Sequence, residues 1–472
     1  MTSHLPAAAP PADGGFRGAP AGSPVAPGGA VSAAGPVSAA VPWLARRLFP
    51  LLATAGLVAV GMASTTWWGP GLLGKHGWLL PHDLWGTLVA ARRLARLDVS
   101  GLYTQPTGLI SLPGAAVILV PVAAVIGATG LSLQVPGAHN PHPGAWLLGG
   151  PYLIIVSAVA LFAADAIAED LGVTRARRAL LAGAGAVALW GVSVGWGHPE
   201  DAVAVGLLLF AILALSHART GRSGWLMGAA VAAQPLALLA LPVILMVIQP
   251  RRLAGFLSRS AAPGALLLAV AAAANWPATV HAVIIQPNWP AIDHPTPWTG
   301  LAPHLSNGAV AAVPARLLAI LAACGCALAA GRRWRAARAT AEWSSQTLAE
   351  LLWWAAVALA MRAVFESVMV AYYLWPVLAV ALVTASRSWP RLVATSLAAA
   401  TLTFVSQVSW RGPWIWWASM VAGLSVTLFL ARVPLRTKGV PAPSRRLAVP
   451  AAGRLSGSPR IQRTQERTGE AS

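Results

Sequence analysis

The sequence predicts an all-α protein, a polytopic bundle of transmembrane helices. Of its 472 residues, 57% are hydrophobic and only 10% are charged, and the mean hydropathy is +0.65. Soluble domains carry about 25% charged residues, so this chain cannot coat a water-facing surface and a soluble multidomain enzyme is excluded. The apolar residues fall in blocks of roughly 18–25 residues, the length at which a helix crosses about 30 Å of hydrocarbon.

Twelve apolar blocks follow one another along the chain, which gives 10 to 12 membrane segments. They centre on residues 48–67, 109–131, 147–168, 179–196, 202–218, 225–248, 262–285, 308–330, 347–363, 367–384, 391–409 and 413–431. If all twelve cross the membrane, the arginines of two loops lie outside, against the rule that places positive loops in the cytoplasm. These are Arg175, Arg177, Arg178, Arg219 and Arg222.

Two of the blocks, 109–131 and 225–248, are each interrupted by two prolines. If both enter and leave on the same side, all of those arginines become cytoplasmic. Broken helices at membrane depth are tolerated where they line a wet cavity, so the same correction predicts a cavity beside these segments. We therefore favour ten spans plus two re-entrant segments, with twelve spans as the alternative.

The membrane domain, residues 43–431, is predicted to lie between two disordered tails. Residues 1–42 are rich in Ala, Pro and Gly, and residues 432–472 are basic, so both tails are expected in the cytoplasm of a multi-pass plasma (inner) membrane protein. The basic residues behind the net charge of +19 are then topology signals, and those of the C-terminal tail can also contact membrane lipids. Nucleic acid is not an expected partner. The outward loop 69–108 belongs to the first half, 44–255, and further helices occupy 256–431.

His82 and Asp83 open a segment in that loop in which Leu84, Leu88 and Ala91 recur at helical spacing. Arginines lie on the opposite side, which predicts an amphipathic helix along the membrane surface. One interpretation of Asp83 is a helix N-cap. The other is a general base that takes a proton from an acceptor hydroxyl, and a cap would also hold such a carboxylate in place.

A short turn between two apolar helices carries His198, Glu200 and Asp201. Pro199 and the two acids are typical of a helix start. Charge at the membrane boundary is costly unless it is wet or paired, so two acids and a histidine also suggest a metal site, a site for a phosphate-linked donor or a proton relay.

A loop rich in Pro and Trp carries Asp293, His294 and Trp298. Such residues are usual at a membrane interface, but flat aromatic faces also stack on sugars and a carboxylate binds their hydroxyls. Arg362 and Glu366 are four residues apart and predict an ion pair, with phosphate binding by Arg362 as the alternative.

Metal and soluble-type nucleotide chemistry have no motif in this sequence. The 10 histidines form no His-x-x-x-His or Cys/His ligand grouping, so no metal site is expected. A Walker loop, a dinucleotide glycine fingerprint and a nucleophile elbow are also absent.

Three stretches resemble a known family. Asp83 is followed by Gly101-Leu102-Tyr103 and a proline-rich hydrophobic segment, then by the turn 197–201, and then by a small-residue helix leading to Gln234-Pro235. Over residues 44–255 this arrangement resembles the GT-C superfamily of membrane glycosyltransferases, in particular the bacterial polyprenyl-phosphate-mannose-dependent mannosyltransferases. His198 stands where that family usually has glutamine, and Gln234 where it commonly has lysine.

The resemblance implies an enzyme that transfers a hexose, with mannose preferred, from a polyprenyl-phosphate-linked donor to an envelope lipid or glycan acceptor on the outer face. It implies Asp83 as the base, with His82 beside it, and no cofactor besides the donor substrate. His198, Glu200 and Asp201 would lie near the donor phosphate or acceptor, and Asp293, His294 and Trp298 in the acceptor wall. A transporter or lipid-carrier flippase, and a noncatalytic membrane scaffold, are the alternatives.

Overall fold

The computed structural model describes residues 43–66, 82–104, 109, 111–133, 144–305, 308–340, 343–408, 412 and 414–433. The predicted tails and the first part of the loop 69–108 lie outside these residues, except for residues 432 and 433. The chain divides into two compact units, 1–46 and 47–472, and the helical bundle belongs to the second.

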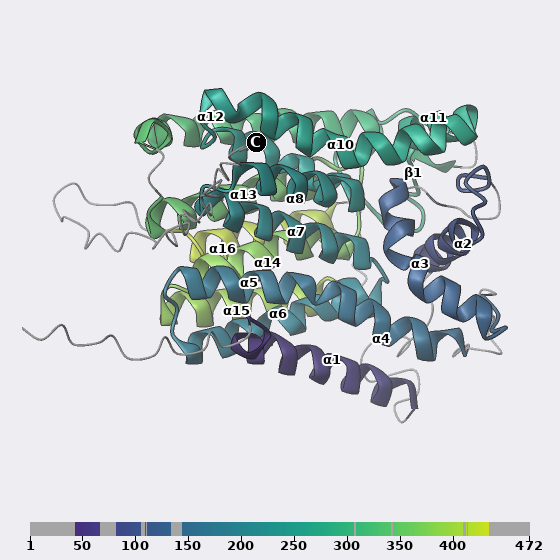
Figure 1. Ribbon diagram of the computed structural model, residues 1–472, viewed down its shortest axis with the longest axis horizontal. Helices are drawn as coiled ribbons and strands as arrows, with labels where there is room; N and C mark the ends of the chain where they lie inside the picture. The colour runs from purple at the N-terminus through teal and green to yellow at the C-terminus, as the bar shows by residue number, and fades with distance from the viewer. Residues whose placement is uncertain are drawn as a thin grey trace, which may run out of the picture. The chain divides into compact units, whose positions relative to one another are not determined.

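The described residues are mostly helical, which confirms the all-α class (Figure 1). The first half contains η1 (Trp43–Arg47), α1 (Leu48–Thr66), α2 (His82–Ala95), α3 (Pro113–Ala128), α4 (Ala145–Ser157), α5 (Val159–Asp170), α6 (Arg175–Trp190), the π-helix η2 (Gly191–Gly195), α7 (Pro199–Ser216), α8 (Thr220–Ala233), η3 (Pro235–Leu239) and α9 (Leu241–Leu245). The second half contains α10 (Pro250–Ala274), α11 (Trp276–Ile285), η4 (Thr299–Leu301), α12 (Val313–Thr340), α13 (Ser345–Phe365), η6 (Ala371–Leu374), α14 (Trp375–Ala385), α15 (Trp389–Val405) and α16 (Ile415–Leu430).

Two small antiparallel strand pairs lie in the connections between helices. Strand β1 (Pro287–Asn288) pairs with β3 (Val310–Ala311), and β2 (His294–Pro295) pairs with β4 (Val368–Met369). The second pair joins the loop after α11 to the segment after α13.

Among the described residues, six helices are long and apolar enough to cross a membrane, so the protein is a membrane-embedded helical bundle. They are Leu147–Asp170, Arg175–Gly195, Pro199–Ser216, Pro250–Ala274, Val313–Arg332 and Ser345–Phe365. Five further apolar helices are shorter, among them α3 and α16. The total of ten or twelve membrane segments stays a prediction.

Local sequence explains where these helices begin and end. Pro199 occupies the first position of α7, where its missing N–H costs nothing and its fixed φ suits a helix. Helix α5 ends at Asp170 because Gly172 adopts a φ of 72°, a left-handed conformation that favours glycine. The N–H of Val173 then donates to the carbonyl of Ala168 at 2.9 Å and closes the helix end.

The proline-interrupted stretch after α7 turns back on itself. Gln234 is extended, with φ −153° and ψ 124°, and separates α8 from η3 and α9. At the start of α10, Arg252 Nη1 donates to Ala218 O at 3.4 Å and to Thr220 Oγ1 at 3.3 Å, so residues 220–249 begin and end at the same end of the bundle. A segment that enters and leaves on one side of a membrane requires this geometry.

Helices α2 and α3 pack against each other at the opposite end of the bundle (Figure 1). Leu84, Leu88 and Ala91 of α2 are buried, as the helical spacing predicts. The start of α3 lies directly against the end of α8, because a Cβ on Gly114 would lie only 2.1 Å from the carbonyl oxygen of Ala232. This contact places α3, on which α2 packs, beside the break that follows α8.

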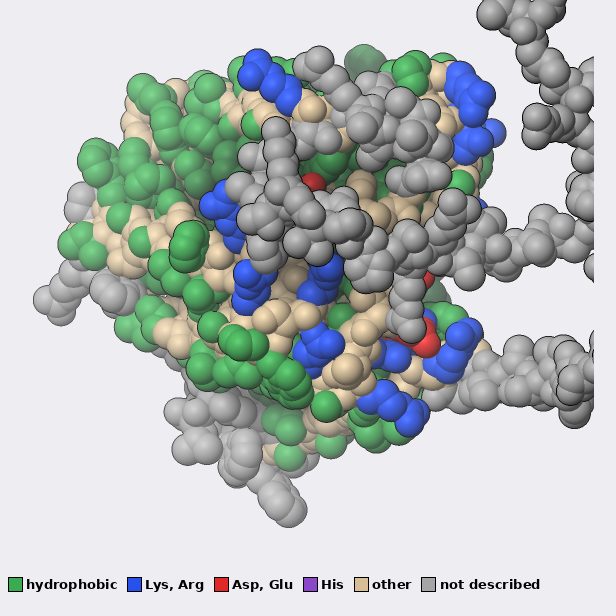
Figure 2. All heavy atoms as spheres, turned by 90° about the vertical axis from the view of Figure 1, so that its left-hand side faces the viewer, with side chains coloured by type: hydrophobic (Ala, Val, Ile, Leu, Met, Phe, Trp, Pro, Cys, Tyr) green, Lys and Arg blue, Asp and Glu red, His purple; other side chains and the backbone are tan. Residues whose placement is uncertain are grey.

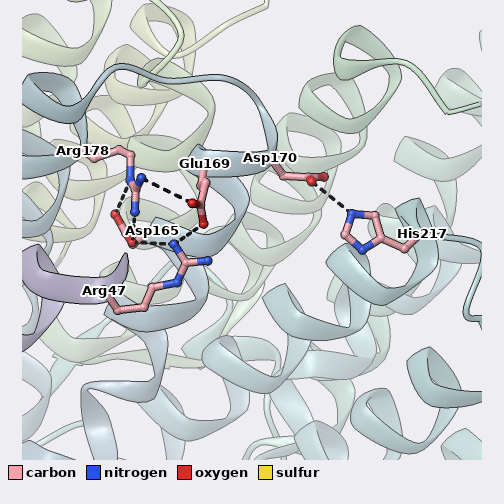
Figure 3. A network of polar contacts seen from close by, with 6 residues as sticks. All are labelled: Arg47, Asp165, Glu169, Asp170, Arg178 and His217. Carbon is pink, nitrogen blue, oxygen red and sulfur yellow. Dashed lines mark hydrogen bonds and ion pairs between the residues drawn. The ribbon is translucent and has the colours of Figure 1, made fainter. Parts of the chain in front are cut away.

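A buried ion-pair network joins Arg47, the residue before α1, to α5 and α6 (Figure 3). Asp165, 1% exposed, accepts hydrogen bonds from Arg47 Nη1 at 3.0 Å and from Arg178 Nε and Nη2 at 2.8 and 2.6 Å. Glu169 adds ion pairs to the same arginines at 2.5 and 3.9 Å. Arg178 is therefore a buried structural partner as well as a topology signal, a role that sequence alone did not reveal.

The same end of the bundle carries the other arginines of the loops. His217, at the end of α7, contacts Asp170 at 3.0 Å (Figure 3), and Arg177 Nη1 donates to Ser386 O at the end of α14 at 3.1 Å. Figure 2 views this end and shows arginine side chains distributed over it among hydrophobic ones. We call it the arginine end of the bundle.

Candidate functional site

A cavity of about 1320 Å³, partly open to solvent, lies at the end of the bundle opposite the arginine end. The start of α7, the break after α8 and the end of α13 contribute to its walls, together with Thr87 of α2. The 18 residues of α7 separate the two ends by about 27 Å, at 1.5 Å per residue. Four residues that the sequence predicted for a substrate site line this cavity: His198, Glu200, Asp293 and Arg362.

Arg362 is the central cation of the cavity wall. Its Nε lies 3.6 Å from Glu366 Oε2, which confirms the predicted ion pair across one helical turn. Its Nη1 lies 4.0 Å from Asp201 Oδ2, and its guanidinium carbon lies 3.7 Å from the centroid of the Tyr373 ring. Two buried carboxylates and an aromatic face therefore hold this guanidinium in a fixed orientation.

A second arginine, Arg316 in the first turn of α12, reaches the same carboxylate. Its Nε donates to Glu366 Oε1 at 3.3 Å and to Oε2 at 3.4 Å. Asn288 Nδ2 donates to Glu366 Oε1 at 3.4 Å and to Ser367 Oγ at 3.3 Å. Arg316 was missed at the sequence level. A signal did exist, because Arg316 directly precedes the apolar run 317–331 of α12, and an arginine beside such a run marks a functional or paired position.

His198 and Glu200 form a close pair before and within the first turn of α7. His198 Nδ1 lies 2.7 Å from Glu200 Oε1, and both residues are buried. The imidazole stacks on Tyr372, with ring centroids 3.9 Å apart and planes 23° from parallel. Trp196 lies 5.8 Å from the same tyrosine ring, which makes a continuous aromatic wall.

The π-helix η2 positions this pair. The N–H of His198 donates to the carbonyl of Val192 at 2.8 Å, and the N–H of Trp196 donates to that of Gly191 at 3.0 Å. Gly197, with a φ of 70°, makes the turn between η2 and α7. Single-turn π-helices occur frequently at functional sites.

Several polar atoms of this cluster are buried without a hydrogen-bond partner in the described part of the chain. Glu200 Oε2 and Arg362 Nη1 are among them. Buried polar groups almost always have a partner, so such atoms beside a cavity indicate water or a bound ligand as the missing partner. The cluster around Arg362 and Glu200 therefore holds charged groups in place and still has polar atoms that can hydrogen-bond to a ligand.

The other predicted residues of the outer loop do not line the cavity. His294 lies in β2 and stacks on Trp416 at 3.8 Å, and burial lowers its pKa from the ordinary value. Trp298 Nε1 donates to Val364 O at 2.7 Å, and its ring packs at 5.2 Å from that of Phe365. Both side chains fasten the loop that carries Asp293.

Gln286 lies at the end of α11, where that loop begins, and it lines the cavity. Its φ of 37° is left-handed and unfavourable for a residue other than glycine. Strain of this kind persists only where the surrounding structure fixes the backbone, and it concentrates at ligand-binding positions.

His82 and Asp83 form the start of α2, as predicted. The structure describes their backbone and not their side chains. Asp83 is one helical turn before Thr87, which lines the cavity. Within the described ranges, no group of three or more His, Cys, Asp or Glu side chains is arranged to hold a metal ion.

Fold and site together describe a membrane-embedded helical protein with a charged, aromatic-walled cavity at one end. The sequence matches no protein-family model, and it has no significant match among curated proteins.

Proposed function

We propose that the protein is an integral membrane glycosyltransferase that transfers a hexose, with mannose preferred, from a polyprenyl-phosphate donor to an envelope lipid or glycan acceptor. The observation that carries the proposal is the cavity in which Arg316 and Arg362 meet Glu200, Asp293 and Glu366. A membrane protein rarely keeps so many ionisable groups together unless they bind or transform a polar substrate.

The two arginines suit the phosphate of the donor. A guanidinium offers paired N–H donors that match phosphate oxygens, and it stays charged at any physiological pH. In the protein alone, Glu366 lies between Arg316 and Arg362 and neutralises part of their charge. A bound phosphate would accept hydrogen bonds from the guanidinium N–H groups of Arg316 and Arg362 that do not contact Glu366.

The remaining walls suit the other parts of the donor. Leu236, Leu239 and Ile320 form an apolar wall on which a prenyl chain can lie. Trp196 and Tyr372 present aromatic faces of the kind that stack on sugar rings. The cavity thus combines the three chemistries that a polyprenyl-phosphate sugar requires.

Asp83 is the proposed base. Its carboxylate takes the proton of an acceptor hydroxyl while that oxygen attacks the anomeric carbon of the donor sugar. The bond between the anomeric carbon and the phosphate oxygen breaks, and polyprenyl phosphate leaves with the electron pair. The position of Asp83, one turn before Thr87 in α2, supports this role.

In this proposal the protein lies in the plasma membrane with both termini in the cytoplasm and the cavity at the outer face. The arginine end supports this orientation, because loops rich in arginine stay on the cytoplasmic side.

Transfer of radiolabelled hexose from a polyprenyl-phosphate donor, in membranes containing the protein, tests the proposal. Wild type should make labelled product, and Asp83→Asn should abolish it without reducing the amount of protein. Asp98→Asn is the matched control, because Asp98 follows α2 and its side chain is 42% exposed. Full activity of Asp83→Asn would refute the base, and absence of transfer by wild type would refute the enzyme.

A lipid-carrier flippase or transporter is the second candidate, and one observation favours it. The break at Gln234 and Pro235 lies directly on the cavity, and transporters commonly build midplane sites from such broken helices. Movement of a labelled polyprenyl-phosphate sugar across a vesicle membrane without a transfer product would support this candidate over the enzyme.

A further inference from the structure

A second concave surface lies between α13 and α16, outside the cavity described above. Its empty space, including the part open to the surroundings, is about 730 Å³. It is lined by Trp353, Val357 and Val364 of α13, by Leu428 and Phe429 of α16, and by Arg432. We call it the α13–α16 groove. Phe429 is 70% exposed, so the groove faces outward from the bundle.

From these features we infer that the groove binds one acyl chain of an anionic phospholipid, with the headgroup at Arg432. This inference is independent of the proposed enzymatic function. Three properties of the groove support it: its length, its apolar lining and the charge at one of its ends.

The length matches one leaflet of a bilayer. Trp353 and Val364 are 11 positions apart in α13, which corresponds to about 16 Å of helix. Half of a hydrocarbon core of about 30 Å is about 15 Å, the depth reached by an acyl chain. The groove therefore extends from the headgroup region to about the middle of the membrane.

The lining of the groove suits a lipid chain. Aliphatic and aromatic side chains of α13 and α16 offer van der Waals contacts along its length, and such packing, not transfer from water, drives association in hydrocarbon.

The charge lies at one end only. Arg432 follows the end of α16 and is exposed, and Arg391 Nη1 donates to its carbonyl oxygen at 3.0 Å. Trp353 Nε1 donates to Leu428 O at 2.9 Å and closes the groove floor near this end. In the part of the chain that the structure describes, the groove lining includes no carboxylate. An exposed arginine at the end of the groove, with Arg391 bound to its backbone carbonyl, attracts an anionic lipid in preference to a zwitterionic one.

Native mass spectrometry of the full-length protein in detergent tests this inference with phosphatidylglycerol and phosphatidylcholine of identical acyl chains. Wild type should retain phosphatidylglycerol more strongly. Arg432→Gln should lower this preference about fivefold, because one cation near the membrane surface contributes about one kcal/mol. Arg251→Gln should leave the preference unchanged, because Arg251 is exposed at the start of α10, away from the groove.

A second pair of variants tests the groove itself. Ser425 lines the groove and is exposed, so Ser425→Trp should fill the groove and reduce retention of both lipids. Val426 is 54% exposed and does not line the groove, so Val426→Trp should retain both lipids as wild type does. Equal retention by Ser425→Trp and Val426→Trp, or an unchanged preference in Arg432→Gln, would overturn the inference. So would a dimer of the wild type that Ser425→Trp dissociates while lipid retention stays unchanged, since the occupant would then be a second copy of the chain.

Discussion

Helix α7 has a cluster of carboxylates and arginines near each of its ends, and the two clusters differ in how completely their charges are paired. At the arginine end, Asp165 accepts three hydrogen bonds from Arg47 and Arg178. At the cavity, Arg362 meets Asp201 only at 4.0 Å, and Glu200 Oε2 has no hydrogen-bond partner among the described residues. Asp165 and its two arginines thus form a closed structural network at one end, and the same side-chain types form an open site at the other.

The difference shows how to separate stabilising charge from functional charge in a membrane protein. A closed network offsets the desolvation of its ions with hydrogen bonds inside the protein, so removal of one member leaves an uncompensated buried charge. An open cluster leaves part of that desolvation uncompensated until a ligand or water completes it. Substitutions in the first should reduce stability, and substitutions in the second should reduce activity.

The largest expected effect on stability is that of Asp165→Asn. It leaves the buried guanidiniums of Arg47 and Arg178 with the partly exposed Glu169 in place of the buried carboxylate between them, and the free energy of unfolding should fall by about 3 kcal/mol. The midpoint of unfolding in detergent measures this loss. Asp98→Asn changes an exposed ion pair at 3.4 Å and should cost less than about 1 kcal/mol. Equal shifts in the two variants would contradict the closed network.

Glu200→Gln should show the opposite pattern. The amide keeps an oxygen that accepts from His198 Nδ1 and removes a buried charge, so the unfolding midpoint should stay unchanged or rise. Transfer activity should fall about 30-fold, because a hydrogen bond from a bound substrate to the charged Glu200 Oε2 contributes about 2 kcal/mol. A drop in stability as large as that of Asp165→Asn would show that both clusters are structural.

A smaller effect is expected for Arg316→Gln. Arg316 is one-third exposed and contacts Glu366 from the edge of the cavity, so its loss should leave the fold intact. Loss of one charge-assisted hydrogen bond to a donor phosphate should raise KM for the donor about tenfold. Steady-state kinetics measure the change, with Arg251→Gln as a control for loss of an exposed arginine. An unchanged KM would remove Arg316 from the binding site.

The smallest effect concerns pH and the loop that carries Asp293. Burial lowers the pKa of His294, so the folded state favours the neutral imidazole. Its contribution to stability is complete above the unfolded pKa of about 6.5 and is lost as the pH falls through the lower folded value. His294→Phe keeps an aromatic ring against Trp416 and should reduce the loss of stability between about pH 7.5 and about pH 5. Identical pH profiles for wild type and variant would exclude this role.

Sequence reasoning succeeded where the determining contacts are local. The spacing of Leu84, Leu88 and Ala91 predicted α2, and the separation of Arg362 and Glu366 predicted their ion pair. Both depend on residues one or two helical turns apart, which a periodic pattern reveals directly.

Contacts between distant segments were not predictable in this way. Arg47 and Asp165 are 118 residues apart, and nothing in the sequence pairs this arginine with that carboxylate. The 50-residue separation of Arg316 and Glu366 explains in the same way why Arg316 was missed. The residue type of Trp298 suggested a place in a substrate wall. In the structure its indole N–H donates a hydrogen bond to the carbonyl of Val364. Pairing of this kind is decided by packing, which composition and spacing do not encode.

The π-helix η2 also has a consequence for how the gene encoding this protein can vary. One extra residue in a helix is absorbed as a π-turn, and each residue added or removed rotates everything beyond it by about 100°. Deleting one residue between Gly191 and Gly195 would therefore turn Trp196 and His198 away from Tyr372 while leaving α6 and α7 able to form. Insertions and deletions should be excluded from these five codons far more strictly than from the connection at Gly172, although neither segment contains a charged residue.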